Sequence, residues 1–228
     1  MASGTNRHYL LQFALSALLL PMASVAAMAG PILNQKYDSA GNLLSVMAQE
    51  YAYTAQTVTA QVAGALVAVE LSVGQSPDFA SPWVLDVIGV LDASPTGEIL
   101  ASQITHLPSP ASFGIPRPFF RIDFSVPAAF DVGDMFALAL HPKHMLDTQL
   151  GLFAGWTGGT GDPYSGGRVY FGNDAGSLVP GSPDFDLNFR TFIAASAVPE
   201  PDSLALFGIG LVAGWQALRF NRRVKHRL

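Results

Sequence analysis

Four aspartates of the last third of the chain, in or beside predicted loops, could hold a hard cation: Asp162, Asp174, Asp184 and Asp186. Calcium binds such carboxylates together with backbone carbonyls. An extended Asp184-Phe185-Asp186 segment turns both carboxylates to one side, because alternate side chains of a strand share a face. The sequence contains no Asp-x-Asp-x-Asp-Gly run, which excludes an EF-hand loop. We therefore expect no cofactor other than a structural calcium ion at Asp184 and Asp186.

Three large aromatic residues lie in or just after a glycine-rich stretch, residues 155–167, and could stack on sugar rings: Trp156, Tyr164 and Tyr170. A long glycine-rich loop between strands can present such side chains on the surface. The stretch lacks the Lys-Ser or Lys-Thr of a phosphate-binding P-loop. The alternative is that Trp156 belongs to the core and the glycines only permit tight turns.

Catalytic or metal-binding arrangements of the histidines have weaker support. His141, His144 and Asp147 are spaced by three, which would place them on one face of a helix. Pro142 interrupts the segment, so a turn with solvated histidines after a strand is the better prediction.

Hydrolytic chemistry has two further candidates. Ser76 is followed two residues later by Asp78, where a nucleophile elbow requires glycine. Glu70 is the best single acid for glycoside hydrolysis, which needs two carboxyl groups. The simpler interpretation is that Glu70 faces solvent from a strand. A secreted hydrolase acting on glycans or esters remains an alternative function.

Short apolar-alternating segments dominate the middle of the chain and would position these residues. Turn residues separate almost all of them, and no amphipathic helix is evident. Residues 99–107 fit either a short helix or a strand. We predict an all-β domain, an antiparallel β-sandwich of the jelly-roll kind. The predicted strands are 51–62, 66–73, 84–91, 119–124, 136–141, 150–156, 169–171 and 187–193.

Charge and cysteine content restrict the partners. Residues 30–197 hold six Lys and Arg against 15 Asp and Glu, a formal net charge of −9 that the whole-chain value of −5 conceals. Such an acidic domain repels phosphate backbones, so we expect no nucleic-acid partner. The chain has no cysteine, which excludes disulfides and thiolate metal sites. Its stability must come from a packed core.

The first 29 residues have the pattern of a secretory signal peptide. Arg7 and His8 precede an apolar helical segment from Tyr9 to Leu20. Ala27-Met28-Ala29 offers the small-x-small pattern of a cleavage site, and we expect cleavage after Ala29. We divide the chain into a signal peptide (1–29), a β-sandwich domain (30–197) and a C-terminal tail (198–228).

The tail combines a short motif (198–201), an apolar segment and a basic end. Residues 203–220 would span about 27 Å as a helix, close to the ~30 Å hydrocarbon core of a bilayer. A basic stop over 219–228 predicts that this end stays cytoplasmic. Its basic residues are Arg219, Arg222, Arg223, Lys225 and Arg227. The sequence thus predicts a transmembrane helix with the domain outside; a plain membrane anchor or a terminal core helix is the alternative.

This tail resembles the PEP-CTERM sorting tail of exported bacterial proteins. The matching motif is Pro199, Glu200 and Pro201. The resemblance implies that a membrane peptidase, the exosortase, recognises the motif and removes the helix and basic end. The product is then found in the envelope or outside the cell, often in organisms that make extracellular polysaccharide. A membrane-anchored precursor would come first.

The domain itself resembles, diffusely, the β-sandwich domains that accompany such tails. The resemblance rests on the segments 56–60, 162–164 and 189–192 and on Gly64. It implies a non-enzymatic or carbohydrate-associated module. From the sequence we expect a non-catalytic envelope or matrix protein, associated with polysaccharide or with a purely structural or adhesive role.

Overall fold

The structure, a computed structural model, describes residues 30–39, 43–47, 52–75, 81–109, 118–144, 154–161 and 164–195, with the backbone alone for residues 43–47. Within these ranges every helix or strand is a β-strand. All strand pairings are antiparallel. The prediction of an all-β domain is confirmed.

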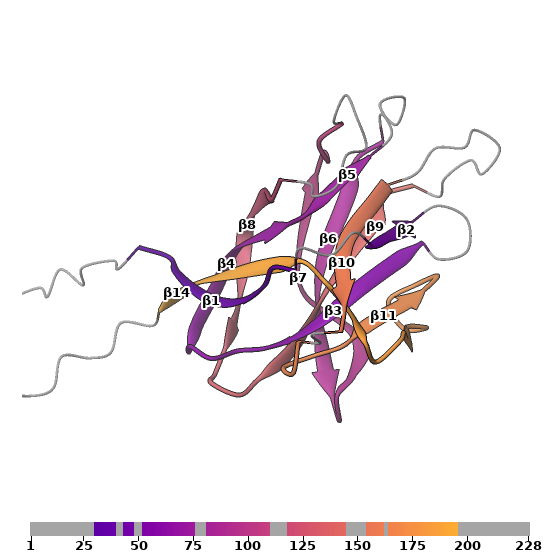
Figure 1. Cartoon of the computed structure of the whole chain (residues 1–228). Coiled ribbons are helices and arrows are strands. Elements are labelled where there is room, and N and C mark those ends of the chain that lie inside the picture. Colours follow the sequence, from indigo (N-terminus) through magenta and orange to yellow (C-terminus); the bar gives the residue numbers. More distant parts are fainter. Residues whose placement is uncertain are drawn as a thin grey trace, which may run out of the picture.

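The strands form three hydrogen-bonded sheets (Figure 1). The six-stranded sheet has the order β12 (Val179–Pro180), β11 (Val169–Gly172), β3 (Tyr53–Thr59), β9 (Met135–Pro142), β6 (Trp83–Leu91) and β7 (Ser94–Thr105). The four-stranded sheet has the order β1 (Ile32–Tyr37), β14 (Phe189–Ala195), β4 (Gly64–Leu71) and β8 (Phe120–Phe130). The third sheet has the order β13 (Phe185–Leu187), β10 (Ala154–Thr160) and β2 (Leu43–Met47), and β5 (Val73–Gln75) also pairs with β10.

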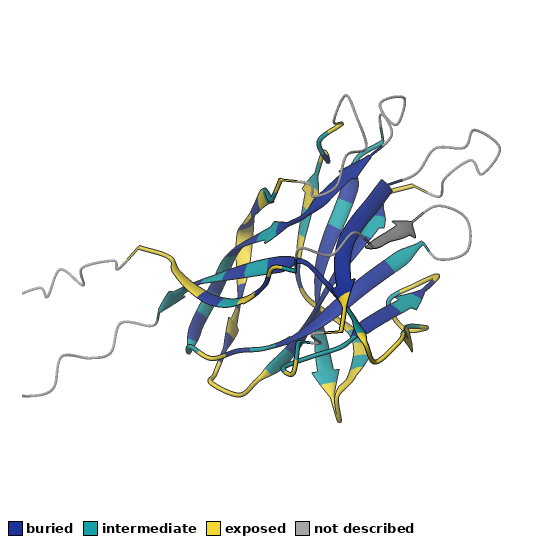
Figure 2. Cartoon of the chain, in the orientation of Figure 1, coloured by how far each residue is buried: buried dark blue, intermediate teal, exposed yellow. Residues whose placement is uncertain are grey.

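The sheets enclose one shared hydrophobic core, as in a β-sandwich. Leu85, Phe136 and Leu138 of the six-stranded sheet belong to the same buried cluster as Val69 and Phe189 of the four-stranded sheet. Buried and more open residues alternate along β4 and β14 of the four-stranded sheet, whereas β3, β9 and β10 are buried along almost their whole length (Figure 2). Without disulfides, this cluster is the main source of stability.

A smaller cluster lies on the opposite face of the six-stranded sheet. Ala55, Ala137 and Ala139 of the neighbouring strands β3 and β9 are buried there with Ile88 and Tyr170. Leu178 and Ala175, between β11 and β12, pack against them. This part of the sheet is therefore covered on both faces.

Several sequence predictions of secondary structure need revision. Residues 99–105 are a strand, the second half of β7, which resolves the ambiguity between helix and strand. The glycine-rich stretch was expected to be a loop, but residues 154–160 form β10. Strands β1 and β2 were not predicted. The predicted signal helix and transmembrane helix lie outside the described residues. Among the described residues, the structure has no helix with the length and apolar character needed to span a bilayer.

Candidate functional site

The predicted processing residues lie outside the described part of the chain. This applies to Ala27 and Ala29 of the expected signal cleavage site and to Pro199, Glu200 and Pro201 of the sorting motif. It also applies to the basic stop, with Arg219, Arg222, Arg223, Lys225 and Arg227. The last strand of the described residues, β14, ends at Ala195.

Trp156 cannot stack on a sugar in this structure, because its side chain is fully buried. It lies on β10, a strand buried along almost its whole length (Figure 2). Its indole Nε1–H donates a hydrogen bond to the backbone carbonyl of Asn188 at 2.8 Å. This position is the one given by the alternative interpretation of the glycine-rich stretch, a core tryptophan. Its ring fills the core and its N–H satisfies a buried carbonyl.

Tyr170 is buried as well, on the outer cluster of the six-stranded sheet. Its hydroxyl donates to the carbonyl of Ala93 at 2.7 Å, in the turn between β6 and β7. Both Asp92 and Ala93 have positive φ in this turn, 48° and 62°. Tyr170 therefore holds a tight turn against the sheet, and in this structure its ring is not exposed for stacking.

Tyr164 is the one member of the predicted aromatic set that is only partly buried. Its ring makes an edge contact with Phe189, with centroids 5.1 Å apart, and its hydroxyl accepts a bond from the Thr59 N–H at 3.4 Å. Burial raises the pKa of Tyr164, and the nearby Asp186 carboxylate raises it further. The three aromatics do not share a surface and form no stacking platform.

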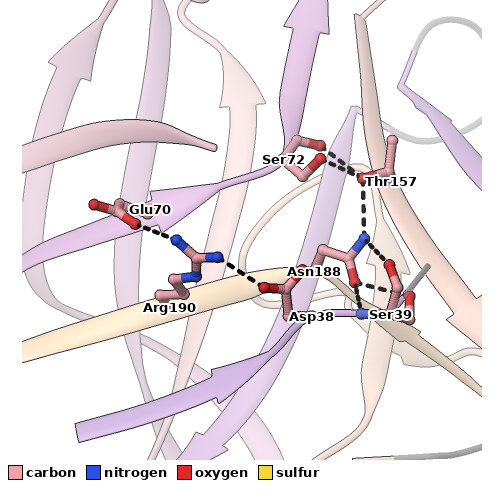
Figure 3. A network of polar contacts seen from close by, with 7 residues as sticks. All are labelled: Asp38, Ser39, Glu70, Ser72, Thr157, Asn188 and Arg190. Atoms are coloured by element: carbon pink, nitrogen blue, oxygen red, sulfur yellow. Dashed lines mark hydrogen bonds and ion pairs between the residues drawn. The ribbon is translucent and has the colours of Figure 1, made fainter. Parts of the chain in front are cut away.

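Polar side chains meet where β10 changes partners, and Figure 3 shows this junction. The first half of β10 pairs with β5 and its second half with β13. Thr157, between the two halves, donates to the Ser72 hydroxyl at 2.6 Å and accepts from Asn188 Nδ2 at 3.2 Å. The Asn188 side-chain oxygen accepts from both the N–H and the hydroxyl of Ser39, each at 2.8 Å. Buried polar groups destabilise a fold unless they are paired, and these side chains pair with one another. The junction therefore stabilises the contact between the strands and has a structural role.

Asp184 and Asp186 do not converge on a shared ligand. Asp184 is exposed in a turn, whereas Asp186 is buried. The two Asp186 oxygens accept from Gln56 Nε2 at 2.8 Å and from the Tyr164 N–H at 2.7 Å. Burial raises the pKa of Asp186, although these two hydrogen bonds oppose the shift.

The geometry around Asp186 does not suit a calcium ion, because protein donors take up both of its oxygens. Among the residues that the structure describes, no three acidic or histidine side chains are grouped closely enough for a metal ion. Asp162 lies outside the described residues, and Asp174 bonds to the backbone N–H of Gly176 at 2.9 Å.

His141 is not the solvated loop residue that the sequence predicts. It lies on β9, on the outer face of the six-stranded sheet, and its Nε2 is 3.0 Å from Asp86 Oδ2. The ring stacks on Tyr53 at 4.0 Å between centroids. Its Nδ1 is 3.0 Å from the carbonyl of Pro142. Both ring nitrogens face acceptors, so neither is free to activate a serine.

Asp86, the carboxylate that contacts His141, is deeply buried, and sequence reasoning missed the pairing of these two residues. Its carboxylate is 3% exposed and Oδ1 has no hydrogen-bond partner among the described residues. Burial raises the pKa of Tyr53, and the charges of Asp86 and Asp174 add to that effect. The available signal in the sequence was that Asp86 interrupts the otherwise apolar strand β6, which indicates a buried polar partner. His144 is exposed, and Asp147 and Ser76 lie outside the described residues.

The outer face of the four-stranded sheet carries a row of paired charges that we call the arginine ladder: Asp38, Glu70, Arg121, Asp123 and Arg190. Arg190 bridges Asp38 at 2.7 Å and Glu70 at 3.2 Å (Figure 3). Arg121 bonds to Asp123 at 2.9 Å and lies 3.9 Å from Glu70. Hydrogen bonding to Asp38 is the main reason that the pKa of Arg190 is raised.

Aromatic rings accompany the arginine ladder. The guanidinium of Arg190 lies 3.9 Å from the ring centroid of Phe119, and that of Arg121 lies 4.8 Å from Phe192. Alternation along the chain is enough to place Arg121 and Asp123 on one face of β8. It could not reveal Glu70 as their common partner, because β4, β8 and β14 are far apart in the chain. Glu70 therefore belongs to an ion-pair network, with its side chain 20% exposed.

Comparison with known proteins concerns the end of the chain. A search of curated proteins finds no match. Residues 197–223 match the PEP-CTERM protein-sorting motif. The match begins two residues after the last strand and includes Pro199, Glu200 and Pro201. The chain therefore carries the sorting signal of a PEP-CTERM protein, which an exosortase processes at the membrane for delivery to the cell envelope or the extracellular space.

Proposed function

We propose that this protein is a non-catalytic component of the cell envelope or extracellular matrix that associates with polysaccharide. The observation that carries the proposal is the sorting motif placed directly behind a β-domain. In this proposal residues 1–29 are removed as a signal peptide and residues 203–220 hold the precursor in the membrane. The basic stop after the helix keeps the C-terminus inside.

The arginine ladder supports the association with polysaccharide. It offers guanidinium donors and carboxylate acceptors in one row on a sheet face, beside the rings of Phe119 and Phe192. Sugar hydroxyls can exchange hydrogen bonds with both kinds of group, and sugar C–H groups pack on rings. The net charge of −9 over residues 30–197 favours a neutral glycan over an anionic one.

The environment of the ionisable groups supports a non-catalytic role. His141 is engaged at both nitrogens, and Glu70 is held between two arginines. Glycoside hydrolysis needs two carboxyl groups beside the scissile bond, whereas the two oxygens of Glu70 face the guanidinium groups of Arg121 and Arg190.

The strand connections support the finer proposal of a jelly-roll-like sandwich. The chain passes from the six-stranded to the four-stranded sheet between β3 and β4 and between β7 and β8, and it returns between β8 and β9. Chain crossings of this kind between two antiparallel layers are characteristic of jelly rolls.

Retention of the processed protein on extracellular polysaccharide tests the proposed association. We expect Arg121→Gln to lower retention on neutral glycans in an array and on the producer's own polysaccharide. Lys143→Gln is the matched control, since Lys143 is an exposed cation that follows β9 of the six-stranded sheet and does not belong to the arginine ladder. Equal retention of wild type and Arg121→Gln would remove the ladder from the proposal. Absence of any glycan binding would leave a purely structural or adhesive role, and turnover of a glycan or ester would favour the alternative of a hydrolase.

Processing in a host that contains an exosortase tests the sorting step. We expect Glu200→Ala, and deletion of residues 219–228, to leave an unprocessed precursor. A mature product of normal size from either variant would reduce the tail to an ordinary membrane anchor.

A further inference from the structure

Both ends of the domain emerge at the same pole of the sandwich. Ile32, at the start of β1, is the register partner of Ile193 on β14. Ala195, the last residue of β14, pairs with Gly64 of β4, which pairs in turn with Phe130 of β8. Figure 1 shows the start of β1 and the end of β14 on the same side of the domain.

We call this region the exit pole and define it by Ile32, Leu33, Gln61, Val132 and Ala195. Side-chain and backbone hydrogen bonds fix its turns. Asn34 of β1 accepts from the N–H groups of Gln61 and Val62 at 2.8 and 3.0 Å. The Gly133 N–H, next to Val132, donates to Ala60 at 2.8 Å. The exit pole is therefore a preformed surface.

Only a very short linker connects the sorting motif to this pole. Pro199 is four residues beyond Ala195, which limits its distance from the end of β14 to about 14 Å even in a fully extended chain. A peptidase that recognises Pro199-Glu200-Pro201 must accommodate several residues on each side of the bond it cleaves. Its surface must then come within contact distance of the folded domain.

The linker cannot be lengthened by unpairing the end of β14 without loss of structure. Ile193 is fully buried and pairs with Ile32 on one side and Leu66 on the other. Pulling out this segment would open both ladders and expose a core side chain. The peptidase therefore meets the pole in its folded form.

The chemistry of the pole suits a protein partner. Three of its side chains are exposed aliphatic groups: Ile32 at 40%, Leu33 at 48% and Val132 at 67%. Asp131 and Asp134 are exposed beside Val132, and their charge disfavours an anionic lipid surface. We propose that the exit pole is a docking surface for the sorting peptidase, so that the folded domain contributes to recognition together with the motif.

The test compares variants of exit-pole residues with and without a longer linker between the domain and the sorting motif. It uses the full-length precursor in an exosortase-containing host. The pole variants are Leu33→Asp and Val132→Asp. Leu91→Asp is the control, because Leu91 is 67% exposed at the end of β6, next to the turn that leads into β7. The longer linker is a Gly-Ser-Gly-Ser-Gly-Ser insertion after Ala195. Melting of each precursor in detergent verifies that the domain remains folded.

We expect each pole variant to slow the appearance of mature protein by about tenfold, the loss typical of a charge placed in an apolar contact. Leu91→Asp should process at the wild-type rate. The insertion should abolish the difference between pole variants and wild type, because the peptidase then no longer touches the pole.

Two results would overturn the docking proposal while the motif keeps its role. One is wild-type processing of both pole variants. The other is that the insertion speeds processing of the wild-type precursor while the pole variants have no effect. That result would mean that the folded domain only hinders access of the peptidase to the motif. A wild-type precursor that stays unprocessed would instead refute the sorting step itself, and the docking proposal with it.

Discussion

Asp186 illustrates how burial and hydrogen bonding compete at a single residue. Gln56 and the Tyr164 backbone both donate to it, which favours the carboxylate, but burial is the larger effect and raises its pKa above the ordinary 3.8. Between the two pKa values the folded protein holds a proton that the unfolded chain has released. The contribution of Asp186 to the free energy of unfolding is therefore largest below pH 3.8 and decreases as the pH rises through the folded-state pKa.

This sign gives a measurable prediction. The difference in free energy of unfolding, wild type minus Asp186→Asn, should fall as the pH rises above about 4 and then level off once Asp186 is ionised in the folded protein. Urea denaturation over a series of pH values measures it. Asp184→Asn, in the exposed turn nearby, is the control. A difference that grows with pH would show that the two hydrogen bonds outweigh burial.

Trp156 provides a second test at the residue scale, because a core role and a sugar-stacking role predict different outcomes. Trp156→Phe removes the N–H that bonds to the Asn188 carbonyl and leaves that buried carbonyl with only the longer bond from the Ser72 N–H, at 3.4 Å. We expect the free energy of unfolding to fall by roughly 1–3 kcal/mol, with glycan retention of the folded protein unchanged. Reduced retention at unchanged stability would return Trp156 to a binding surface.

At the scale of elements, strand β10 shows where sequence reasoning failed and why. Glycines disfavour strands, so the stretch from residue 155 onward was predicted as a loop. In the structure, Gly158 and Gly159 form part of a buried strand, because the backbone of β13 and the side chain of Ser39 approach too closely for any other residue. Tertiary contacts determine this strand, and they come from residues about 30 and 120 positions away in the chain.

Local pattern was sufficient for strands with a strongly apolar or alternating sequence. Residues 136–141, predicted as a strand, lie within β9, and residues 187–193 cover the end of β13 and most of β14. β1 was missed because its polar residues carry no such alternation; its pairing with β14 joins opposite ends of the domain. The arginine ladder and the pair of Asp86 and His141 escaped prediction for the same reason, since each joins different strands.

Substitution of Gly158 tests this account of β10. A Cβ on Gly158 would collide with the Asp186 carbonyl oxygen and would lie 2.8 Å from a ring carbon of Phe185. We expect Gly158→Ala to lower the free energy of unfolding by roughly 1–3 kcal/mol, as overpacking does. Gly176→Ala is the matched control, since its Cβ would meet only Asp174 Oδ1, at 3.4 Å. Denaturant unfolding should show a small change for the control, and equal effects would refute a close strand contact.

At the scale of the whole molecule, opposite charges are separated along the chain. Residues 30–197 carry a net charge of −9, whereas residues 198–228 hold five basic residues and two acidic ones, a net charge of +3. The match to the sorting motif ends at residue 223, within the basic cluster. Removal of this tail therefore changes the electrostatic attraction of the protein to an anionic membrane as well as its covalent tether.

Vesicle binding measures this change directly. We expect the full-length precursor to sediment with vesicles of mixed phosphatidylglycerol and phosphatidylcholine, and the processed protein to stay in solution because an anionic surface repels its acidic domain. Raising the salt concentration should weaken that repulsion without producing firm binding, since screening removes a barrier but adds no attraction. Stronger sedimentation of the processed protein with anionic than with neutral vesicles would show that the domain has a lipid-binding surface of its own. In that case the exit pole, with its exposed aliphatic side chains, would be the first region to substitute.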